Sequence, residues 1–235
     1  MTYLANNTRP DISMAVHQCA RFRSAPRALH ELAVKRIAQY LLATKHQGLS
    51  LKPTQSFALE MFVDADFAGR WHREYSHLRV NVLSRTGFIV TFCGCPVSWS
   101  SKLQSDIVLS TTESEYIALS SGVRELLPLR RILQDIYAHT FIQNTAATAD
   151  RISTHNFQSR VTAPSRIYED NNACIVLATT DSPQFKPWTK HISLKYHHFK
   201  DYIRNGNISI VKVDTTQNWA DIFTKPLVQV KFKYL

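Results

Sequence analysis

The hydrophobic pattern changes from helical to strand-like near the first quarter of the chain. Residues 8–50 have the spacing of two helices, with Pro10 and Pro26 at first helical positions and Ser24 as a cap of the second. The apolar side of this second helix comprises Leu29, Leu32, Ile37, Tyr40 and Leu41. We therefore expect an N-terminal helical appendage over residues 1–52.

From Phe57 onward, short runs rich in aromatic and β-branched residues predict strands. The runs are FALEMFVDADF, RTGFIVTFCG, CPVSWSSKL, SRIYED and ISIVKV, and a turn at Gly94–Pro96 joins the second and third as a hairpin. Helices are predicted from about Thr112 to Ile136 and over NNACIVLATT, TKHISLKYHHFKDYIRNG and NWADIFTKPL. Antiparallel strands followed by strand–helix units indicate an α/β fold with a five-stranded mixed sheet flanked by helices.

Two features interrupt this pattern. Pro128 lies inside the longest predicted helix and should kink or interrupt it. Residues 138–164 are polar and lack a clear period, which indicates an exposed, flexible insertion. We assign residues 53–230 to one domain that contains this insertion.

Composition narrows the class of protein only modestly. The 235 residues are 44% hydrophobic and carry a net charge of +10, which suits a polyanionic partner such as a nucleic acid. The four cysteines form no metal-binding or disulfide framework, which favours a reducing compartment. The sequence contains no secretory signal and no membrane-spanning run, so we expect a cytoplasmic or nuclear protein without a membrane partner.

Four acidic residues lie where strands or helices should begin or end: Asp64, Glu115, Asp170 and Asp221. Each has an ordinary explanation, because acids are common in strand-end turns, helix caps and first helical turns. Together they suggest a site, since like charges repel unless a cation lies among them, and Mg²⁺ prefers oxygen ligands. Two ions held roughly 3.5–4 Å apart would support phosphoryl transfer.

Five segments together resemble the ribonuclease H domain of copia-type LTR retrotransposon polyproteins. They are VDADFAG, SRTGFIVTFCGCPVSWSSKLQSDIVLSTTESEYIAL, YEDNNACIVLA, KHISLKYHHFKDYI and VDTTQNWADIFTKPL. The segments YLANNTRPDISMAV and AVKRIAQYLLATKHQGL resemble the connection between reverse transcriptase and ribonuclease H in the same polyproteins. The resemblance thus extends over nearly the whole chain.

This resemblance implies a ribonuclease H-like fold and hydrolysis of the RNA strand of an RNA–DNA hybrid. It implies catalytic and metal-binding roles for Asp64, Glu115, Asp170 and Asp221, with two Mg²⁺ ions or Mn²⁺ as a substitute. The family pattern selects Asp64 over Asp66 and Glu115 over Glu113. The reverse transcriptase domain of the parent polyprotein is the implied protein partner.

The sequence departs from the wider family in ways that keep other functions open. VDTTQN lacks the His that many ribonucleases H carry before the last acid, and no Y-x-D-D polymerase motif occurs. A catalytically silent nucleic-acid-binding remnant is therefore the main alternative to an active nuclease. DNA strand transfer by the same fold is a third possibility, disfavoured by the order of the acids. The sequence does not indicate an oligomeric state.

Several polar residues are candidates for binding the hybrid. The basic, aromatic segment between Lys186 and Arg204 is suited to phosphate contacts, while residues near the acids are suited to the minor groove and its 2′-hydroxyls. The candidates are Lys102, Gln104, Ser110, Thr111, Asn171, Lys190, His191 and Lys195. For each, a solvated surface or a turn and capping hydrogen bond is an equally valid interpretation.

Overall fold

A five-stranded mixed sheet organises the protein in a computed structural model, which describes residues 1–54, 57–69, 71–75, 77, 79–144, 163–180 and 198–234. The strands are β1 (Leu59–Asp66), β2 (Arg85–Phe92), β3 (Cys95–Leu103), β4 (Ser165–Glu169) and β5 (Ile208–Lys212). Their order is β3-β2-β1-β4-β5; β1, β2 and β3 pair antiparallel, whereas β4 is parallel to β1 and β5. The predicted α/β fold with a mixed sheet is confirmed, and its topology is compatible with a ribonuclease H-like fold.

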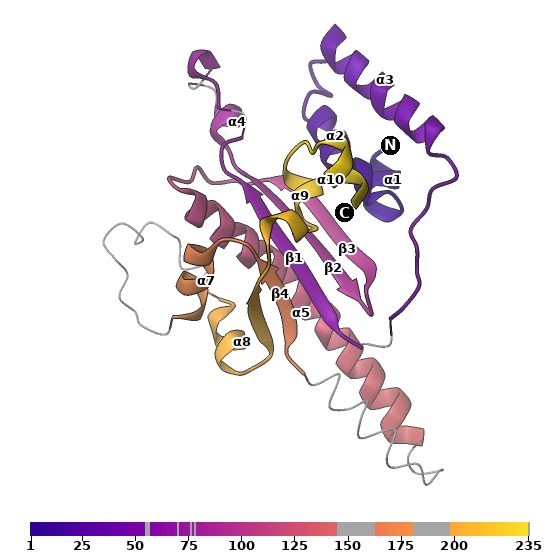
Figure 1. The fold of residues 1–235 in the computed structure, drawn as a ribbon, viewed down its shortest axis with the longest axis vertical. Coiled ribbons are helices and arrows are strands. Elements are labelled where there is room, and N and C mark those ends of the chain that lie inside the picture. Colours follow the sequence, from indigo (N-terminus) through magenta and orange to yellow (C-terminus); the bar gives the residue numbers. More distant parts are fainter. Residues whose placement is uncertain are drawn as a thin grey trace.

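Helices cover both faces of this sheet. They are α1 (Thr2–Asn7), α2 (Ser13–Ala20), α3 (Ala28–Ala43), α4 (Arg79–Val82), α5 (Thr111–Asn144), α7 (Asn172–Thr179), α8 (Lys200–Arg204), α9 (Asp221–Thr224) and α10 (Gln229–Tyr234). Short 3-10 turns lie at Pro10–Ile12, Arg73–Tyr75 and Thr215–Gln217. The long helix α5 lies behind the sheet in Figure 1 and extends past its lower end, while α9 and α10 lie in front.

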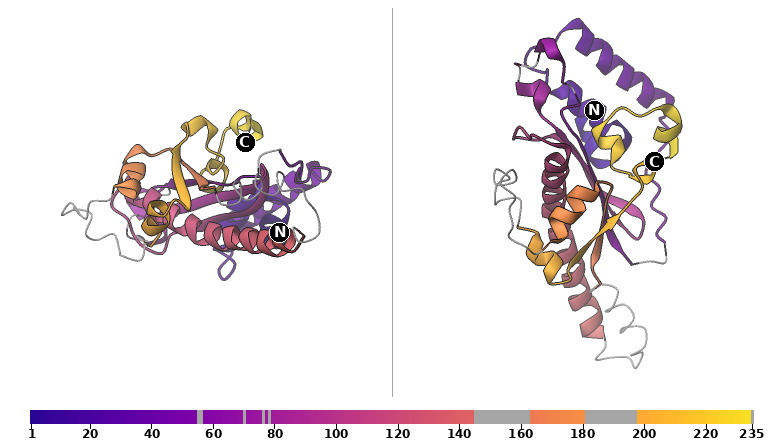
Figure 2. Two further views of the ribbon diagram at one scale, coloured as in Figure 1. Left: turned by 90° about the horizontal axis from the view of Figure 1, so that it is seen from below. Right: turned by 60° about the vertical axis from the view of Figure 1, so that its left-hand side comes forward.

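The main core lies between the sheet and α5. Alternate residues of β1, such as Met61 and Val63, point to the face that α5 covers with Tyr116, Leu119 and Val123. Helices α7 and α8 complete this layer beside β4 and β5, as the turned view in Figure 2 shows. Helix α5 continues through Pro128 to Asn144, so the predicted interruption at Pro128 is wrong, whereas a kink there stays a prediction.

The N-terminal helices form a smaller core against the opposite face of the sheet. Ala5, Ile12, Val16 and Ile37 are its buried members. The indole N–H of Trp99 on β3 donates to the carbonyl oxygen of Ala5 at 2.7 Å, which ties this group of helices to the edge strand.

Several predicted details of the N-terminal helices are wrong. The helical region includes α1, which lies before residue 8, and Arg27 rather than Ser24 precedes α3 as its cap residue. Leu29 and Leu32 are 76% and 55% exposed, so the apolar side of α3 is confined to its C-terminal half. Only that half contacts the smaller core, where Ile37 is buried.

Two loop predictions also require correction. The β2–β3 turn is formed by Cys93 and Gly94, both with positive φ (53° and 77°), which is the backbone of a tight two-residue hairpin; Cys95 already belongs to β3. The predicted insertion at 138–164 begins later, because α5 continues to Asn144. Most of that segment, and the predicted basic helix before residue 198, lie outside the described residues.

Candidate metal centre

Three carboxylates from three different elements meet at one end of β1. Asp64 belongs to β1, Glu115 to the start of α5, and Asp170 directly follows β4. One oxygen atom from each lies within 4.8 Å of the others. Because β1 and β4 are parallel neighbours, the ends of both strands bring Asp64 and Asp170 to the same edge of the sheet.

Local structure distinguishes Glu115 from Glu113 and Asp64 from Asp66. The Ser110 hydroxyl accepts a hydrogen bond from the Glu113 N–H at 3.1 Å, and the Glu113 carboxylate accepts one from the Leu109 N–H at 2.8 Å. Glu113 therefore serves the start of α5, and Glu115 reaches the cluster. Asp66 lies against the turn at Gly69, where an added Cβ would come within 1.8 Å of its carboxylate.

Burial dominates the electrostatics of this cluster. Asp64 is 2% and Glu115 7% exposed. Burial raises the pKa of Asp64 to about 6, an effect that Lys225 opposes and Asp221 reinforces. Burial and then the charge of Glu169 raise the pKa of Glu115 well above its usual value. Within the described part of the chain, Glu115 Oε2 has no hydrogen-bond partner.

Glu169 is a buried acid that sequence reasoning missed. It is fully buried, and one of its carboxylate oxygens accepts the Asn171 N–H at 3.0 Å while the other has no hydrogen-bond partner among the described residues. Burial raises its pKa to about 8. The period of the strand SRIYED provided the missed signal, because Glu169 shares the buried face of β4 with Ile167.

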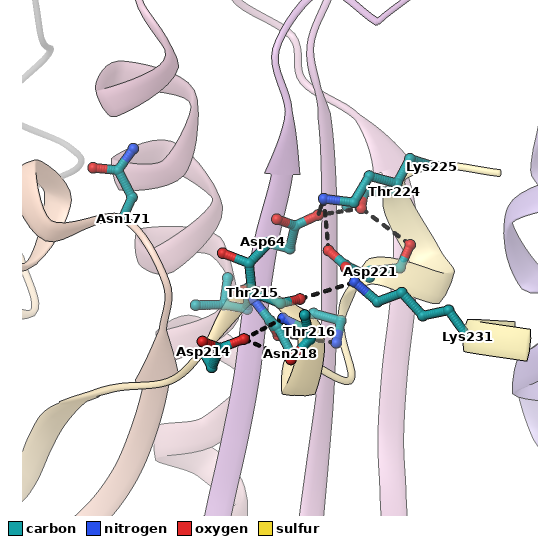
Figure 3. Close-up of polar contacts among 12 residues, drawn as sticks. Asp64, Asn171, Asp214, Thr215, Thr216, Asn218, Asp221, Thr224, Lys225 and Lys231 are labelled. Atoms are coloured by element: carbon teal, nitrogen blue, oxygen red, sulfur yellow. Dashed lines mark hydrogen bonds and ion pairs between the residues drawn. The ribbon is translucent and has the colours of Figure 1, made fainter. Parts of the chain in front are cut away.

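Asp221 lies beside the cluster rather than within it. It is fully buried at the start of α9, and it is not among the three described residues whose oxygens converge. The Lys225 ammonium lies 2.7 Å from Asp221 Oδ1 and 3.6 Å from Asp64 Oδ2, and Lys231 contacts Asp221 Oδ2. Figure 3 shows the Lys225 amino group directed between the two carboxylates.

Polar contacts hold α9 against β1 at this point. The Thr224 hydroxyl donates to the Asp64 carboxylate. The side-chain amide of Asn218, which is fully buried, donates to the Val63 carbonyl at 2.9 Å, and its oxygen accepts the Ala220 N–H at 3.1 Å. Neither Thr224 nor Asn218 was singled out from the sequence, although both belong to the motif that contains Asp221.

The proposed hybrid-binding residues have diverse positions. Gln104 is buried and donates to Thr86 Oγ1 and to the Ser114 carbonyl, so its side chain is committed inside the protein rather than presented to a ligand. The Asn171 oxygen accepts the Cys174 N–H at 3.0 Å as the cap of α7. Ser110 caps α5, as described above. Three further candidates lie outside the described residues: Lys190, His191 and Lys195.

Two further candidates, Lys102 and Thr111, lie at the surface, as Ser110 does. Thr111 is the first residue of α5 and is exposed four positions before Glu115. Lys102 is exposed on β3 and lines a cavity of about 530 Å³ together with Ser121 and Arg124 of α5. This cavity lies between α5 and the sheet, over strands β2 and β3.

The three-carboxylate cluster has the chemistry of a divalent-cation site. Hard oxygen ligands from Asp and Glu are those that Mg²⁺ takes in phosphoryl-transfer enzymes. Glu115 Oε2 is buried next to two further acids and has no hydrogen-bond partner among the described residues, so a cation bound there would provide its partner. The described residues therefore fit one cation at Asp64, Glu115 and Asp170.

Comparison with known proteins identifies the relatives. The chain is 32% identical over 99% of its length to "Retrovirus-related Pol polyprotein from transposon RE1" of Arabidopsis thaliana, of which it spans 14%. It is 32% identical over 96% of its length to the corresponding protein from transposon TNT 1-94 of Nicotiana tabacum, again spanning 14%. A shorter match, 37% identical over 52% of the chain, spans 81% of "Secreted RxLR effector protein 161" of Plasmopara viticola.

Over almost its whole length, the chain is similar to one part of the Pol polyproteins of copia-type retrotransposons. It corresponds to a small part of each of them. No protein-family profile matches the chain, and no solved structure matches it significantly. Among the described residues, no helix is both long and apolar enough to cross a membrane.

Proposed function

We propose that the chain is the ribonuclease H region of a copia-type Pol polyprotein, preceded by its connection segment. It would hydrolyse the RNA strand of an RNA–DNA hybrid in a metal-dependent reaction. The observation that carries this proposal is the convergence of Asp64, Glu115 and Asp170 at the end of the central strand of a β3-β2-β1-β4-β5 sheet. The relatives support a Pol origin, and the cluster supports the type of chemistry.

The residues of the cluster would hold Mg²⁺, with Mn²⁺ as a substitute. A bound Mg²⁺ polarises the phosphoryl group and lowers the pKa of a water molecule. In the hydrolysis of the RNA strand, the water oxygen would form a bond to phosphorus and the P–O3′ bond would break. One product then carries a 5′-phosphate, and the 3′-oxygen of the other takes up a proton. The three acids would define where these events occur, because β1, α5 and the β4–α7 junction position them.

The surface around the cluster supports a polyanionic substrate. The net charge of +10 favours association with nucleic acid, and the exposed Thr111 lies in the first turn of the helix that carries Glu115. Lys102 and Arg124 add positive charge on the α5 side of the sheet. The parent reverse transcriptase domain would deliver the hybrid to this site.

Cleavage of a labelled RNA–DNA hybrid in Mg²⁺ tests the proposal. The purified chain should cut the RNA strand, whereas the Asp64→Asn and Asp170→Asn variants should bind the hybrid without cutting it. No cleavage by the unmodified chain, or equal cleavage by both variants, would contradict the proposal. Hybrid binding without cleavage by any form would instead identify a silent remnant, and nicking of duplex DNA would indicate strand-transfer chemistry.

A further inference from the structure

The ammonium group of Lys225 lies between the carboxylates of Asp64 and Asp221, the acid outside the cluster. A second divalent cation held by these two acids would have to take the position of this ammonium group. Lys225 Nζ already bridges them, at 3.6 Å from Asp64 Oδ2 and 2.7 Å from Asp221 Oδ1. The position between these two carboxylates is therefore filled by a positive charge from the protein itself.

The second oxygen of Asp221 is also engaged. Lys231 of α10 contacts Asp221 Oδ2, and the same ammonium donates to the Thr215 carbonyl at 2.8 Å. Asp221 has no exposed surface, so an incoming hydrated ion would have to displace at least one lysine before reaching it. Mg²⁺ gives up its own water reluctantly, which makes such a displacement unfavourable.

The fold holds Lys225 in this position. Lys225 follows Asp221 by four residues, so the helical turn of α9 brings the two side chains together. The neighbouring Thr224 donates to Asp64, which fixes the distance of α9 from β1. The Lys225 side chain is 35% exposed, so its ammonium faces both the buried acids and the solvent.

Lys225 is a basic residue whose ammonium group lies against the carboxylates of Asp64 and Asp221. An ammonium group beside the cluster can donate hydrogen bonds to a phosphate oxygen without transferring its proton. It can thus supply fixed positive charge next to the scissile bond.

We propose that the protein binds a single divalent cation, at Asp64, Glu115 and Asp170, and that Lys225 occupies the place of the second. This inference rests on the proposed function and deepens it, because it concerns the same reaction. It also revises the sequence-based expectation of two Mg²⁺ ions. The fourth acid serves to hold Lys225 and Lys231 rather than to bind metal.

Counting bound ions tests this directly and does not require activity. The full chain is titrated with Mn²⁺, and free Mn²⁺ is measured by electron paramagnetic resonance. We expect one ion per unmodified chain and two per Lys225→Met chain, since Met keeps the length of the side chain and removes its charge. Lys225→Arg and Lys231→Met should each still bind one ion, because a cation remains between Asp64 and Asp221.

The outcomes separate the two proposals. Two ions on the unmodified chain would overturn the role of Lys225 while leaving the proposed metal site intact. One ion on both the unmodified chain and a folded Lys225→Met variant would also overturn it. No bound ion on the unmodified chain would overturn the proposed metal site itself, and with it this inference. Circular dichroism of each variant establishes folding, and the count on the unmodified chain does not depend on any variant.

Discussion

Gly87 lies directly opposite Asp64 in the antiparallel ladder between β1 and β2. A Cβ atom at Gly87 would lie 2.6 Å from Thr224 Cγ2 and 2.8 Å from Phe223 Cβ. The missing side chain thus allows α9 to approach the sheet closely enough for Thr224 to donate to Asp64. A position in the second strand thereby determines how Asp221 and Lys225 meet the first.

The Gly87→Ala substitution should displace α9. Overpacking against Phe223 should lower the free energy of unfolding by about 1–3 kcal/mol. It should also reduce hybrid cleavage, because Lys225 moves away from Asp64. Gly122→Ala is the matched control: its Cβ would meet the flexible end of the Met61 side chain at 2.7 Å, which can shift, and Ala favours the helix. Thermal unfolding and cleavage assays check both, and equal effects would contradict this account.

The two glutamates at the start of α5 should behave differently. Glu115→Gln removes a charge from the cluster, and we expect cleavage to fall by about two orders of magnitude or more with no loss of stability. Glu113→Gln keeps the capping geometry at Ser110 and should leave both cleavage and stability nearly unchanged. If Glu113→Gln alone abolished cleavage, the assignment of Glu115 would be wrong.

Glu169 should make the metal-free protein less stable as the pH rises. Its pKa is raised from 4.5 to about 8 in the folded state, so the folded protein retains a proton that the unfolded chain releases. This contribution to stability is complete below pH 4.5 and is lost as the pH increases to about 8. The slope for one group is up to about 1.4 kcal/mol per pH unit.

The Glu169→Gln variant tests this dependence. Gln retains an oxygen for the Asn171 N–H and cannot ionise, so the variant should be more stable than the unmodified protein near pH 8 and similar to it below pH 4.5. Urea unfolding in a chelator across this range measures the difference. Parallel stability curves for the two proteins would contradict a buried, protonated Glu169.

Gln104 should contribute to stability and not to substrate binding. Gln104→Ala leaves the buried Ser114 carbonyl and Thr86 hydroxyl without their partner, which should cost about 1–3 kcal/mol. The exposed Lys102 on the preceding strand β3 is the comparison, because Lys102→Ala should leave the unfolding temperature unchanged. Hybrid affinity measured for both variants at two salt concentrations should fall, if at all, only for Lys102→Ala.

The sequence predicted the individual helices and strands better than it predicted which of them pack against one another. Runs rich in aromatic and β-branched residues and the apolar spacing of α5 sufficed to predict the strands and the main helix. The packing of α2 and α9 on the same sheet face depends on contacts such as that of Ser101 with the Phe223 carbonyl, which join residues far apart in the chain. No local pattern encodes such a contact.

The three clustered acids of the candidate site could be predicted from the sequence, whereas the lysines that pair with Asp221 could not. Asp64, Glu115 and Asp170 each lie near the end or the start of an element, and the sequence pattern indicates these positions. Lys225 and Lys231 were not singled out from the sequence, since the ion pairs of a lysine depend on which residues fold against it. The prediction for Gln104 was wrong in the opposite sense. This polar residue after a strand was expected to bind the hybrid, yet its side chain is buried.

The hydrogen bond from Trp99 to Ala5, together with the edge-on contact of Tyr40 with Phe232, has a consequence for how the polypeptide can be divided. Residues of the first helices and of the last helix lie on one face of the sheet. The segment 44–54, which connects α3 to the sheet domain, contains no helix or strand. A cut in that connection would leave two pieces still held together by their side chains. The two fragments would then remain bound to each other as a noncovalent complex, although the chain between them is cleaved.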